Sequence, residues 1–186
     1  MPFRSLPEPR WHPCRSAPAH LARGPLRTWL LDRGSLTARL VALSRGQFEV
    51  QVLCQKTGRP RPSEQRALGM DTRQWAWIRE VILLGREKPW VYARSVIPLS
   101  TLTGRQRSLR RLDKRPLGAL LFSDPGMVRG PIELASQNTR TTPLPGPLQH
   151  LQADIPGRRS LFWLDGKPLL VCEMFLPEFT PYNTPL

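Results

Sequence analysis

The stretch from residue 74 to residue 100 constrains the fold more than any other part of this sequence. It reads QWAWIREVILLGREKPWVYARSVIPLS, with two apolar, β-prone runs on either side of a Gly-Arg-Glu-Lys turn. Runs of this kind joined by a short turn are typical of an antiparallel hairpin. Both alternating rows of the first run are mostly apolar, so periodicity alone does not show which face lies on the core. We therefore expect a fold built on antiparallel strands.

Shorter patterns place the other elements around this hairpin. The segment RRSLFWLDGKPLLVCEMFLP at 158–177 predicts a second hairpin centred on Asp165-Gly166, and 47–55 and 130–136 alternate as strands do. A first helix is predicted between Leu26 and Gly34, and a second after the N-cap Ser35, ending at Gly46. Parts of 103–122 are also helical in pattern, with Pro116 in a first turn. Pro-rich connectors are predicted at 57–66 and 137–157.

The order of these elements predicts the fold class. Five or six strands joined as hairpins, rather than through βαβ units, favour an α+β protein on an antiparallel sheet. A chain of 186 residues is expected to form one domain. Residues 1–25 are rich in Pro and Arg and lack periodicity, so we predict a flexible N-terminal arm there and a folded domain over 26–186. Within this arm, Trp11 is a candidate to pack onto the core of the domain.

The charge of the chain admits two interpretations. The net charge is +14 and the pI is about 11.3, which favours binding to nucleic acid or to an acidic membrane surface. Only four of the 28 basic residues are lysines, and the arginines are spread from Arg4 to Arg159. This bias, together with abundant Pro and Ala, is also what a GC-rich genome produces. The scattered distribution favours compositional background over a nucleic-acid footprint.

Several classes of site are disfavoured by the motifs. Three cysteines without a CxxC or Cys/His pairing argue against a disulfide framework and a structural zinc site. No apolar run reaches the roughly 18 residues of a membrane span, and the N-terminus lacks the apolar stretch of a signal peptide, so we expect a cytoplasmic protein. GxxxxGK[ST], HExxH and GxSxG do not occur, and no Ser/His/Asp or Cys/His set points to nucleophilic hydrolysis.

Two arginines interrupt apolar rows of the first hairpin. Arg79 shares its row with tryptophan, valine and leucine, and Arg94 shares its row in the return strand with tryptophan, tyrosine and valine. A turn centred between Arg86 and Glu87 would place Arg79 directly across from Arg94, and two adjacent guanidinium groups are destabilising unless an anion lies between them. The alternatives are a one-residue slip in register, or two arginines that reach solvent from the surface. An anion site at Arg79 and Arg94 is therefore one of three interpretations that the sequence leaves open.

A carboxylate interrupts the last strand in the same way. Glu173 shares its row with Val171 and Phe175, where an unpaired carboxylate would be unfavourable. A turn centred on Asp165-Gly166 would oppose Glu173 with Arg158, so an ordinary cross-strand ion pair is the alternative to a ligand contact.

Taken together, several of these segments resemble the bacterial chorismate lyase family. They are WIREVILLGREKPWVYARSVIPLSTLTG (77–104), RPLGALLF (115–122), PIEL (131–134) and RRSLFWLDGKPLLVCEMFLP (158–177), in the family's order. The resemblance covers roughly Leu26 to Tyr182. It implies conversion of chorismate to 4-hydroxybenzoate and pyruvate, the first committed step of ubiquinone biosynthesis, without a metal or organic cofactor. It also implies a six-stranded antiparallel sheet with helical flaps over an enclosed ligand.

The resemblance assigns roles to five residues. It implies that Arg79 binds a ligand carboxylate and that Arg94 completes the cationic site. It implies that Leu117 binds the ligand through its backbone and that Glu173 faces the hydroxyl end of the ring. Leu36 stands where the family has a methionine in its flap, which preserves an apolar contact. Arg79 and Glu173 are thereby the expected catalytic residues.

Three departures from the family pattern are visible. Ala93 stands where glycine is familiar, which tightens any backbone approach to a ligand there. Residues 137–157 are longer than the usual connection, which predicts either a surface loop or a changed lid. The usual tryptophan before G-R-R-S is replaced by Pro156 or Ile155.

Two other classes of function remain open from the sequence. Related folds serve as effector-binding modules of transcriptional regulators, but these carry an N-terminal winged helix that residues 1–25 cannot form. A basic nucleic-acid-binding protein would be expected to cluster surface arginines with exposed aromatic side chains. We therefore expect chorismate as substrate and 4-hydroxybenzoate as product, with a monomer that spans no membrane and binds no nucleic acid.

Overall fold

The structure is a computed structural model that describes residues 7–181. Its centre is one antiparallel sheet in the order β1-β6-β7-β8-β4-β3-β2, with β5 pairing to β7 outside this path. The strands are β1 (His12–Pro13), β2 (Phe48–Gly58), β3 (Ala76–Gly85), β4 (Lys88–Pro98), β5 (Val128–Arg129), β6 (Glu133–Asn138), β7 (Asp154–Leu164) and β8 (Lys167–Phe175).

The α+β class is confirmed, but the expected number of six strands is wrong. The described chain has eight strands in the sheet. Six of them are long, and the other two, β1 and β5, contain two residues each. An alternation of apolar and polar residues needs at least four positions to be visible in a sequence, so strands of two residues leave no such pattern.

The first hairpin forms as predicted but with a different register. Arg86 and Glu87 form its turn with positive φ angles of 52° and 65°, and Gly85 pairs with Lys88. A bulge between Leu83 and Leu84 then shifts the pairing by one residue. Arg79 therefore lies across from Ser95, and Arg94 lies across from Glu80. The predicted pairing of Arg79 with Arg94 is wrong, and the two arginines point to opposite faces of the sheet.

The second hairpin has the predicted register. Asp165 and Gly166 form its turn with φ angles of 50° and 75°, and Arg158 lies across from Glu173. Without a bulge between the turn and this pair, the position of the turn fixes the pairing over the whole hairpin. The expected cross-strand neighbours are confirmed.

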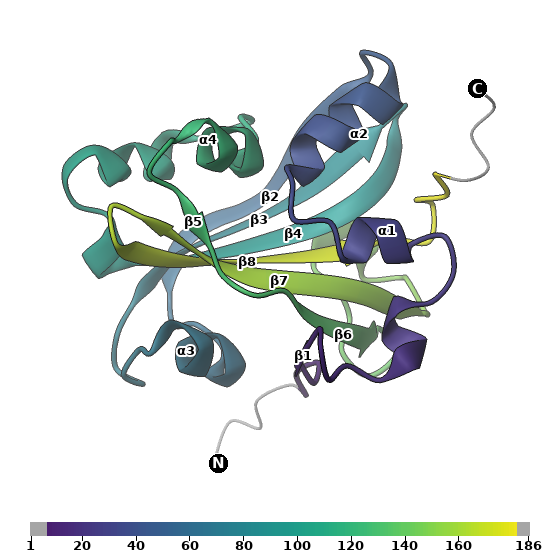
Figure 1. Cartoon of the computed structure of the whole chain (residues 1–186), viewed down its shortest axis with the longest axis horizontal. Coiled ribbons are helices and arrows are strands. Elements are labelled where there is room, and N and C mark those ends of the chain that lie inside the picture. Colours follow the sequence, from purple (N-terminus) through teal and green to yellow (C-terminus); the bar gives the residue numbers. More distant parts are fainter. Residues whose placement is uncertain (1–6, 182–186) are drawn as a thin grey trace.

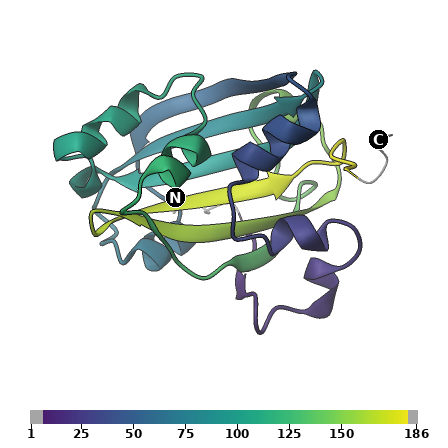
Figure 2. The ribbon, with the colours of Figure 1, turned by 45° about the horizontal axis from the view of Figure 1, so that its top comes forward.

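Helices cover the two faces of the sheet unequally (Figures 1 and 2). One face, called the α2/α4 face below, carries α1 (Arg27–Leu30), α2 (Leu36–Ser44), α4 (Leu117–Ser123) and the 3₁₀ segment η3 (Gly104–Arg111); smaller 3₁₀ turns are η1 (Ala19–Ala22), η2 (Leu99–Thr101) and η4 (Gly146–Leu148). The other face, called the α3 face, carries α3 (Pro62–Leu68) and the 139–153 loop. Each face buries its own apolar clusters against these layers.

The sequence predicted a connector at 57–66, but helix α3 begins within this segment, at Pro62, and continues to Leu68. Pro62 occupies its first turn, and the Glu64 carboxylate accepts a hydrogen bond of 2.8 Å from the backbone N–H of Arg61. Proline at the first helical position with an acidic residue two positions later is a helix start signal. The Pro-rich composition concealed it.

The described part of the predicted arm makes defined contacts. His12–Pro13 pairs with β6, Leu21 is buried in the core of the α2/α4 face, and Trp11 packs against apolar clusters of the α3 face. The flexibility of residues 1–25 stays a prediction, and residues 1–6 lie outside the described range. The domain boundary at residue 26 also stays a prediction.

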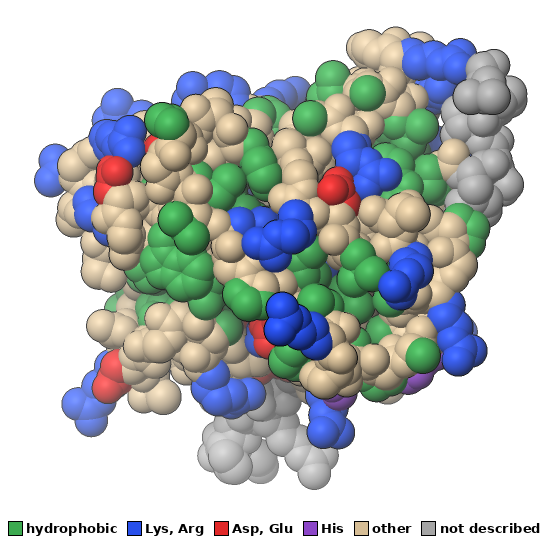
Figure 3. Space-filling model, viewed as in Figure 1, with side chains coloured by type: hydrophobic (Ala, Val, Ile, Leu, Met, Phe, Trp, Pro, Cys, Tyr) green, Lys and Arg blue, Asp and Glu red, His purple; other side chains and the backbone are tan. Residues whose placement is uncertain are grey.

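Lys and Arg side chains occur over much of the face of the molecule in Figure 3. Several of them lie near one another at the upper left of this view, and others are separated by polar and apolar side chains. Within residues 7–181 no helix is long and apolar enough to cross a membrane.

Candidate functional site

A cavity lies on the α2/α4 face, between the sheet and the helices above it. Its volume is about 40 Å³. The sheet contributes side chains of β3, β4, β7 and β8, and the cover comes from the start of α2, from α4 and from β5. The lining residues are Gly34, Leu36, Thr37, Arg79, Val81, Leu83, Ala93, Ser95, Pro116, Leu117, Gly118, Leu121, Phe122, Arg129, Arg158, Phe162, Val171 and Glu173.

The cavity brings together four of the five residues expected in the site. Arg79, Leu117, Glu173 and Leu36 line it, although they come from segments that are far apart in the sequence. Arg94 does not line it, because its side chain points to the α3 face. The roles given to these residues stay predictions, whereas their placement around one cavity is observed.

Arg79 is almost fully buried, with 2% of its surface exposed. Its Nη2 donates hydrogen bonds of 2.8 Å to the carbonyl of Asp113 and 3.0 Å to the carbonyl of Arg115. Its Nε is buried and has no hydrogen-bond partner among the described residues. Burial lowers the pKa of Arg79, and the nearby Asp113 partly offsets this effect. A buried cation with a free donor is an arrangement that an anionic ligand would complete.

Leu36 and Leu117 cover the cavity from the first turns of two helices. The Ser35 hydroxyl accepts a hydrogen bond of 3.2 Å from the Ala38 N–H, which confirms the predicted N-cap of α2. Pro116 is the N-cap residue of α4, so the backbone N–H of Leu117 lies at the start of that helix. The helices meet closely, because a Cβ at Gly118 would lie 2.6 Å from Oγ1 of Thr37.

Glu173 lines the cavity and also makes the predicted ion pair. Its Oε2 lies 2.6 Å from Nε of Arg158, and the side chains are 17% and 1% exposed. Nη1 of Arg158 donates two further hydrogen bonds of 2.7 Å, to the carbonyls of Trp29 and Asp32. The two interpretations of Glu173 are therefore compatible: one oxygen holds Arg158, and the residue still borders the cavity.

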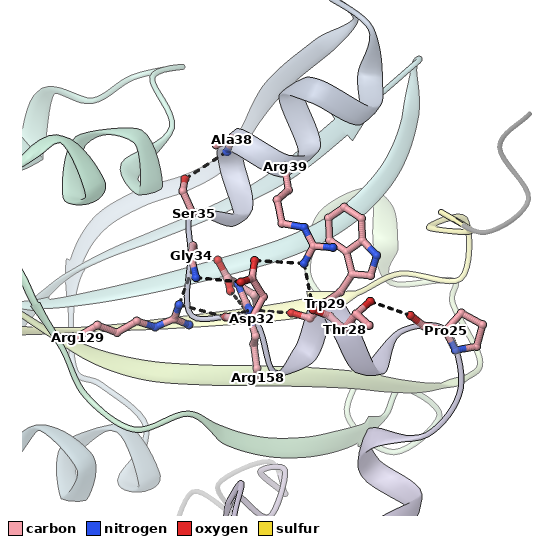
Figure 4. Close-up of polar contacts among 11 residues, drawn as sticks. Pro25, Thr28, Trp29, Asp32, Gly34, Ser35, Ala38, Arg39, Arg129 and Arg158 are labelled. Atoms are coloured by element: carbon pink, nitrogen blue, oxygen red, sulfur yellow. Dashed lines mark hydrogen bonds and ion pairs between the residues drawn. The ribbon is translucent and has the colours of Figure 1, made fainter. Parts of the chain in front are cut away.

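The turn between α1 and α2 is fixed by arginines from three elements (Figure 4). Arg158 reaches this turn from β7, and Arg129 reaches it from β5. Nη1 of Arg129 donates hydrogen bonds of 3.3 Å to the carbonyls of Asp32 and Gly34. Arg39 of α2 pairs with Asp32 at 3.1 Å and stacks 3.7 Å above the ring of Trp29. Burial alone would raise the pKa of Asp32, but the Gly34 N–H and Arg39 hold it below its usual value.

Arg129 is a cavity residue that the sequence analysis missed. It lies in the two-residue strand β5, and its neighbours in the sequence follow no periodic pattern that would direct it inward. Its Nε lies 3.3 Å from the Ser160 hydroxyl. Burial and the neighbouring Arg158 lower the pKa of Arg129 to about 10, so it stays cationic at neutral pH. The only sequence signal was its proximity to the PIEL segment.

Arg94 is held in a buried ion-pair network on the α3 face. It donates to both oxygens of Glu64 at 2.6 and 3.0 Å and to Glu80 at 2.8 Å, and Tyr92 donates to Glu80 at 2.7 Å. Burial alone would lower the pKa of Arg94, but Glu64 and Glu80 hold it above its usual value. The expectation that Arg94 stands beside Arg79 fails because the bulge in the first hairpin turns it to the other side.

The fold and the cavity define this chain as a one-sheet α+β protein with an enclosed, cationic cavity under short helices. Comparison with solved structures gives the same architecture. The effector domain of PhnF from Mycobacterium smegmatis superposes with a TM-score of 0.56 over 80% of this chain and 91% of that chain, at 16% identity. The C-terminal domain of the histidine utilization repressor from Pseudomonas syringae gives a TM-score of 0.51 over 75% and 98%, at 9% identity. At these identities the likeness shows the fold alone.

Sequence comparison identifies the family. The model of the chorismate lyase family matches residues 16–182. A protein of Marinobacter nauticus named "Probable chorismate pyruvate-lyase" is 41% identical over 162 residues, which cover 87% of this chain and 80% of that protein. A protein of Pseudomonas aeruginosa with the same name is 42% identical over 151 residues, 81% and 82% of the two chains. The chain belongs to the chorismate lyase family, as its motifs predicted.

Proposed function

We propose that this protein converts chorismate to 4-hydroxybenzoate and pyruvate, as the first committed step of ubiquinone biosynthesis. The observation that supports this most directly is the placement of Arg79 and Glu173 around one cavity. They lie on β3 and β8, with β4 between them. A ring ligand between them can direct its carboxylate to one side and its hydroxyl to the other.

The reaction needs positioning and charge stabilisation more than it needs a reactive side chain. The bond between ring C3 and the ether oxygen breaks, C4 gives up its hydrogen as a proton, and the ring becomes aromatic. The departing enolpyruvate gains one proton at its methylene carbon and becomes pyruvate, so the atoms balance. Aromatisation supplies the driving force. The protein must hold the side chain in a reactive pose and stabilise the negative charge that develops on the departing ether oxygen. Buried arginines in a closed site do both.

Each predicted residue has a defined task in this proposal. Arg79 binds the ring carboxylate through its free Nε, while its Nη2 fixes the 113–115 turn. Leu117 adds its backbone N–H, and Leu36 closes the apolar side of the ring. Glu173 accepts a hydrogen bond from the 4-hydroxyl, and Arg158 orients the Glu173 carboxylate. Arg94 takes no part in ligand contact in this proposal.

Ligand entry requires the cover to move. A cavity of about 40 Å³ has room for a few water molecules, which is less than a substituted six-membered ring needs. The cover includes two short helices, α2 and α4, whose close approach at Thr37 and Gly118 narrows the space. Outward movement of these helices would admit the ligand, and closure over it would exclude water.

The assay for this function is direct. Purified protein is incubated with chorismate, and 4-hydroxybenzoate and pyruvate are measured together. Equal amounts of both are expected, and the yield should survive exhaustive chelation because the proposed chemistry needs no metal or organic cofactor. Loss of turnover in EDTA that magnesium or zinc restores would contradict that part of the proposal. Ligand binding without product formation would favour the alternative of a non-catalytic effector-binding module.

The alternative of a nucleic-acid-binding protein has its own test. Arginines spread along the whole sequence predict weak, sequence-independent binding to duplex DNA that disappears by about 0.2 M salt. Tight and sequence-selective binding at that salt would favour the alternative. We also propose that the protein acts in the cytoplasm as a monomer, which gel filtration with light scattering would check for the oligomeric state.

A further inference from the structure

The cavity carries more positive charge than its own residues neutralise. Three guanidinium groups, those of Arg79, Arg129 and Arg158, and one carboxylate, that of Glu173, line it. Arg158 is paired with Glu173 at 2.6 Å. Within residues 7–181, neither Arg79 nor Arg129 forms an ion pair with a carboxylate. Two positive charges therefore remain, which suits a ligand with two negative charges.

The two unpaired arginines approach the cavity from opposite sides. Arg79 lies on β3, and Arg129 lies beside Phe162 of β7. The strands between them are β7, β8 and β4, so β3 and β5 are separated by four strand spacings, or about 19 Å. Glu173 lies on β8, next to β7 and hence on the side of Arg129. The order across the cavity is a cation, a carboxylate and a second cation.

We propose that Arg129 binds the carboxylate of the enolpyruvyl side chain of chorismate, an inference that rests on the function proposed above. In chorismate the ring carboxylate at C1 and the hydroxyl at C4 are at opposite ends of the ring. The enolpyruvyl ether at C3 is next to the hydroxyl. With the C1 carboxylate at Arg79 and the hydroxyl at Glu173, the second carboxylate comes to lie on the side of Arg129.

The present contacts of Arg129 leave it available for this role. Its hydrogen bonds are long, 3.3 Å each, and go to a hydroxyl and two carbonyls rather than to a carboxylate. A charged, bidentate contact with a carboxylate is stronger than such contacts. The carbonyls belong to Asp32 and Gly34, in the turn that leads into α2. Arg129 therefore lies where the substrate side chain and the cover of the cavity meet.

This position separates substrate from product. Chorismate has both carboxylates, whereas 4-hydroxybenzoate retains only the one at Arg79. Cleavage of the C3–O bond transfers the second carboxylate to the departing pyruvate. Arg129 therefore holds the leaving group during the reaction and contributes nothing to the binding of the aromatic product.

The experiment compares substrate and product in the full-length protein carrying Arg129→Gln or Arg129→Lys. We expect kcat/KM for chorismate to fall on the order of 100-fold in Arg129→Gln, because a charge-assisted contact in a partly buried site is lost. Arg129→Lys should recover part of the loss, since it restores the charge without the fork geometry. Inhibition by 4-hydroxybenzoate should keep its Ki within about twofold in both variants.

Arg66→Gln is the matched control. It removes one positive charge from α3, on the opposite face of the sheet, and should leave both measurements unchanged. Equal losses for chorismate and 4-hydroxybenzoate in the Arg129 variants would overturn the inference, and so would unchanged kcat/KM. If Arg129→Gln does not fold, the same comparison in Arg129→Lys decides. Wild-type protein that forms no 4-hydroxybenzoate would instead refute the proposed function itself.

Discussion

The two faces of the sheet bury arginines in opposite electrostatic settings. On the α3 face, Arg94 meets the two carboxylates Glu64 and Glu80, and Arg159 pairs with Glu133 at 2.6 Å. On the α2/α4 face, three arginines line the cavity with the single carboxylate of Glu173, which pairs with Arg158 alone. The first face neutralises its cations internally, and the second leaves positive charge directed into a cavity.

This difference distinguishes a structural arginine from a ligand-binding one. A fully paired buried arginine fixes neighbouring elements, as Arg94 fixes α3 through Glu64. A buried arginine without a carboxylate is unfavourable in the free protein, and a ligand can supply the missing charge. The comparison therefore predicts that substitutions on the α3 face mainly change stability, whereas those in the cavity mainly change activity.

Arg94→Met should give the largest effect on stability. It leaves Glu64 and Glu80 buried without their cation, and breaking a buried ion pair in this way reduces the free energy of unfolding by about 3–5 kcal/mol. Urea unfolding measures the loss, with Arg66→Met, an exposed position of the same helix layer, as the control. kcat/KM of the protein that remains folded should stay within about threefold. A stable Arg94→Met protein that has lost activity would restore the ligand role predicted from the sequence.

Arg79→Ala should give the converse result. We expect kcat/KM for chorismate to fall by about 100- to 1000-fold, because the charged contact with the ring carboxylate is lost from a desolvated site. The carbonyls of Asp113 and Arg115 also lose a donor, so stability should fall by about 1–3 kcal/mol. Arg79→Lys should recover only part of the activity. A fully active Arg79→Ala protein would break the distinction between the two faces.

Whether the sequence predicted the correct face for a side chain depended on the local geometry of each hairpin. The Asp165-Gly166 turn set the register of the second hairpin, so the pair of Glu173 and Arg158 followed from counting. In the first hairpin the turn was also right, but the bulge at Leu83 moved Arg94 to the other face. A bulge depends on packing on both sides of the sheet, which a single strand's alternation does not reveal.

The other differences between the predicted and the observed elements also have local physical causes. The capping residues of α2 were readable because Ser35 acts within one helical turn, whereas α3 was concealed in a Pro-rich stretch despite Pro62 and Glu64. Arg129 enters the cavity from a strand of two residues, which is too short to show a periodicity. The cavity therefore became visible only once distant segments were brought together by the fold.

Glu173 tests whether the cavity carboxylate acts by hydrogen bonding or by proton transfer. If it accepts the 4-hydroxyl, Glu173→Gln keeps shape and acceptor capacity and should retain activity within about tenfold, while Glu173→Ala should lose considerably more. An obligatory proton carrier would leave both variants nearly inactive, because an amide cannot exchange that proton. Unfolding measurements accompany the kinetics, since Glu173→Ala also leaves Arg158 unpaired. Unchanged kcat/KM in Glu173→Ala would remove this residue from the site.

Substitution of Glu80 should change the free energy of unfolding least among these variants. It also tests whether the stability of the α3 face depends on pH. Burial alone would raise the pKa of Glu80, but hydrogen bonds and charge from Tyr92 and Arg94, together with the charge of Arg61, hold it below the usual 4.5. A carboxyl group whose pKa is lowered by folding contributes stability that is fully present above about pH 4.5 and is lost as the pH falls through the folded value.

Glu80→Gln should therefore lower the free energy of unfolding by about 1 kcal/mol at pH 7, because Arg94 keeps its two contacts with Glu64. The difference between wild type and variant should shrink as the pH falls from 4.5 toward 3. Urea unfolding across pH 3–7 measures it. Glu49→Gln is the control, an exposed carboxylate 3.6 Å from Lys114, and should change stability by less than about 0.5 kcal/mol. A difference that stays constant down to pH 3 would mean that the charge of Glu80 does not stabilise the α3 face.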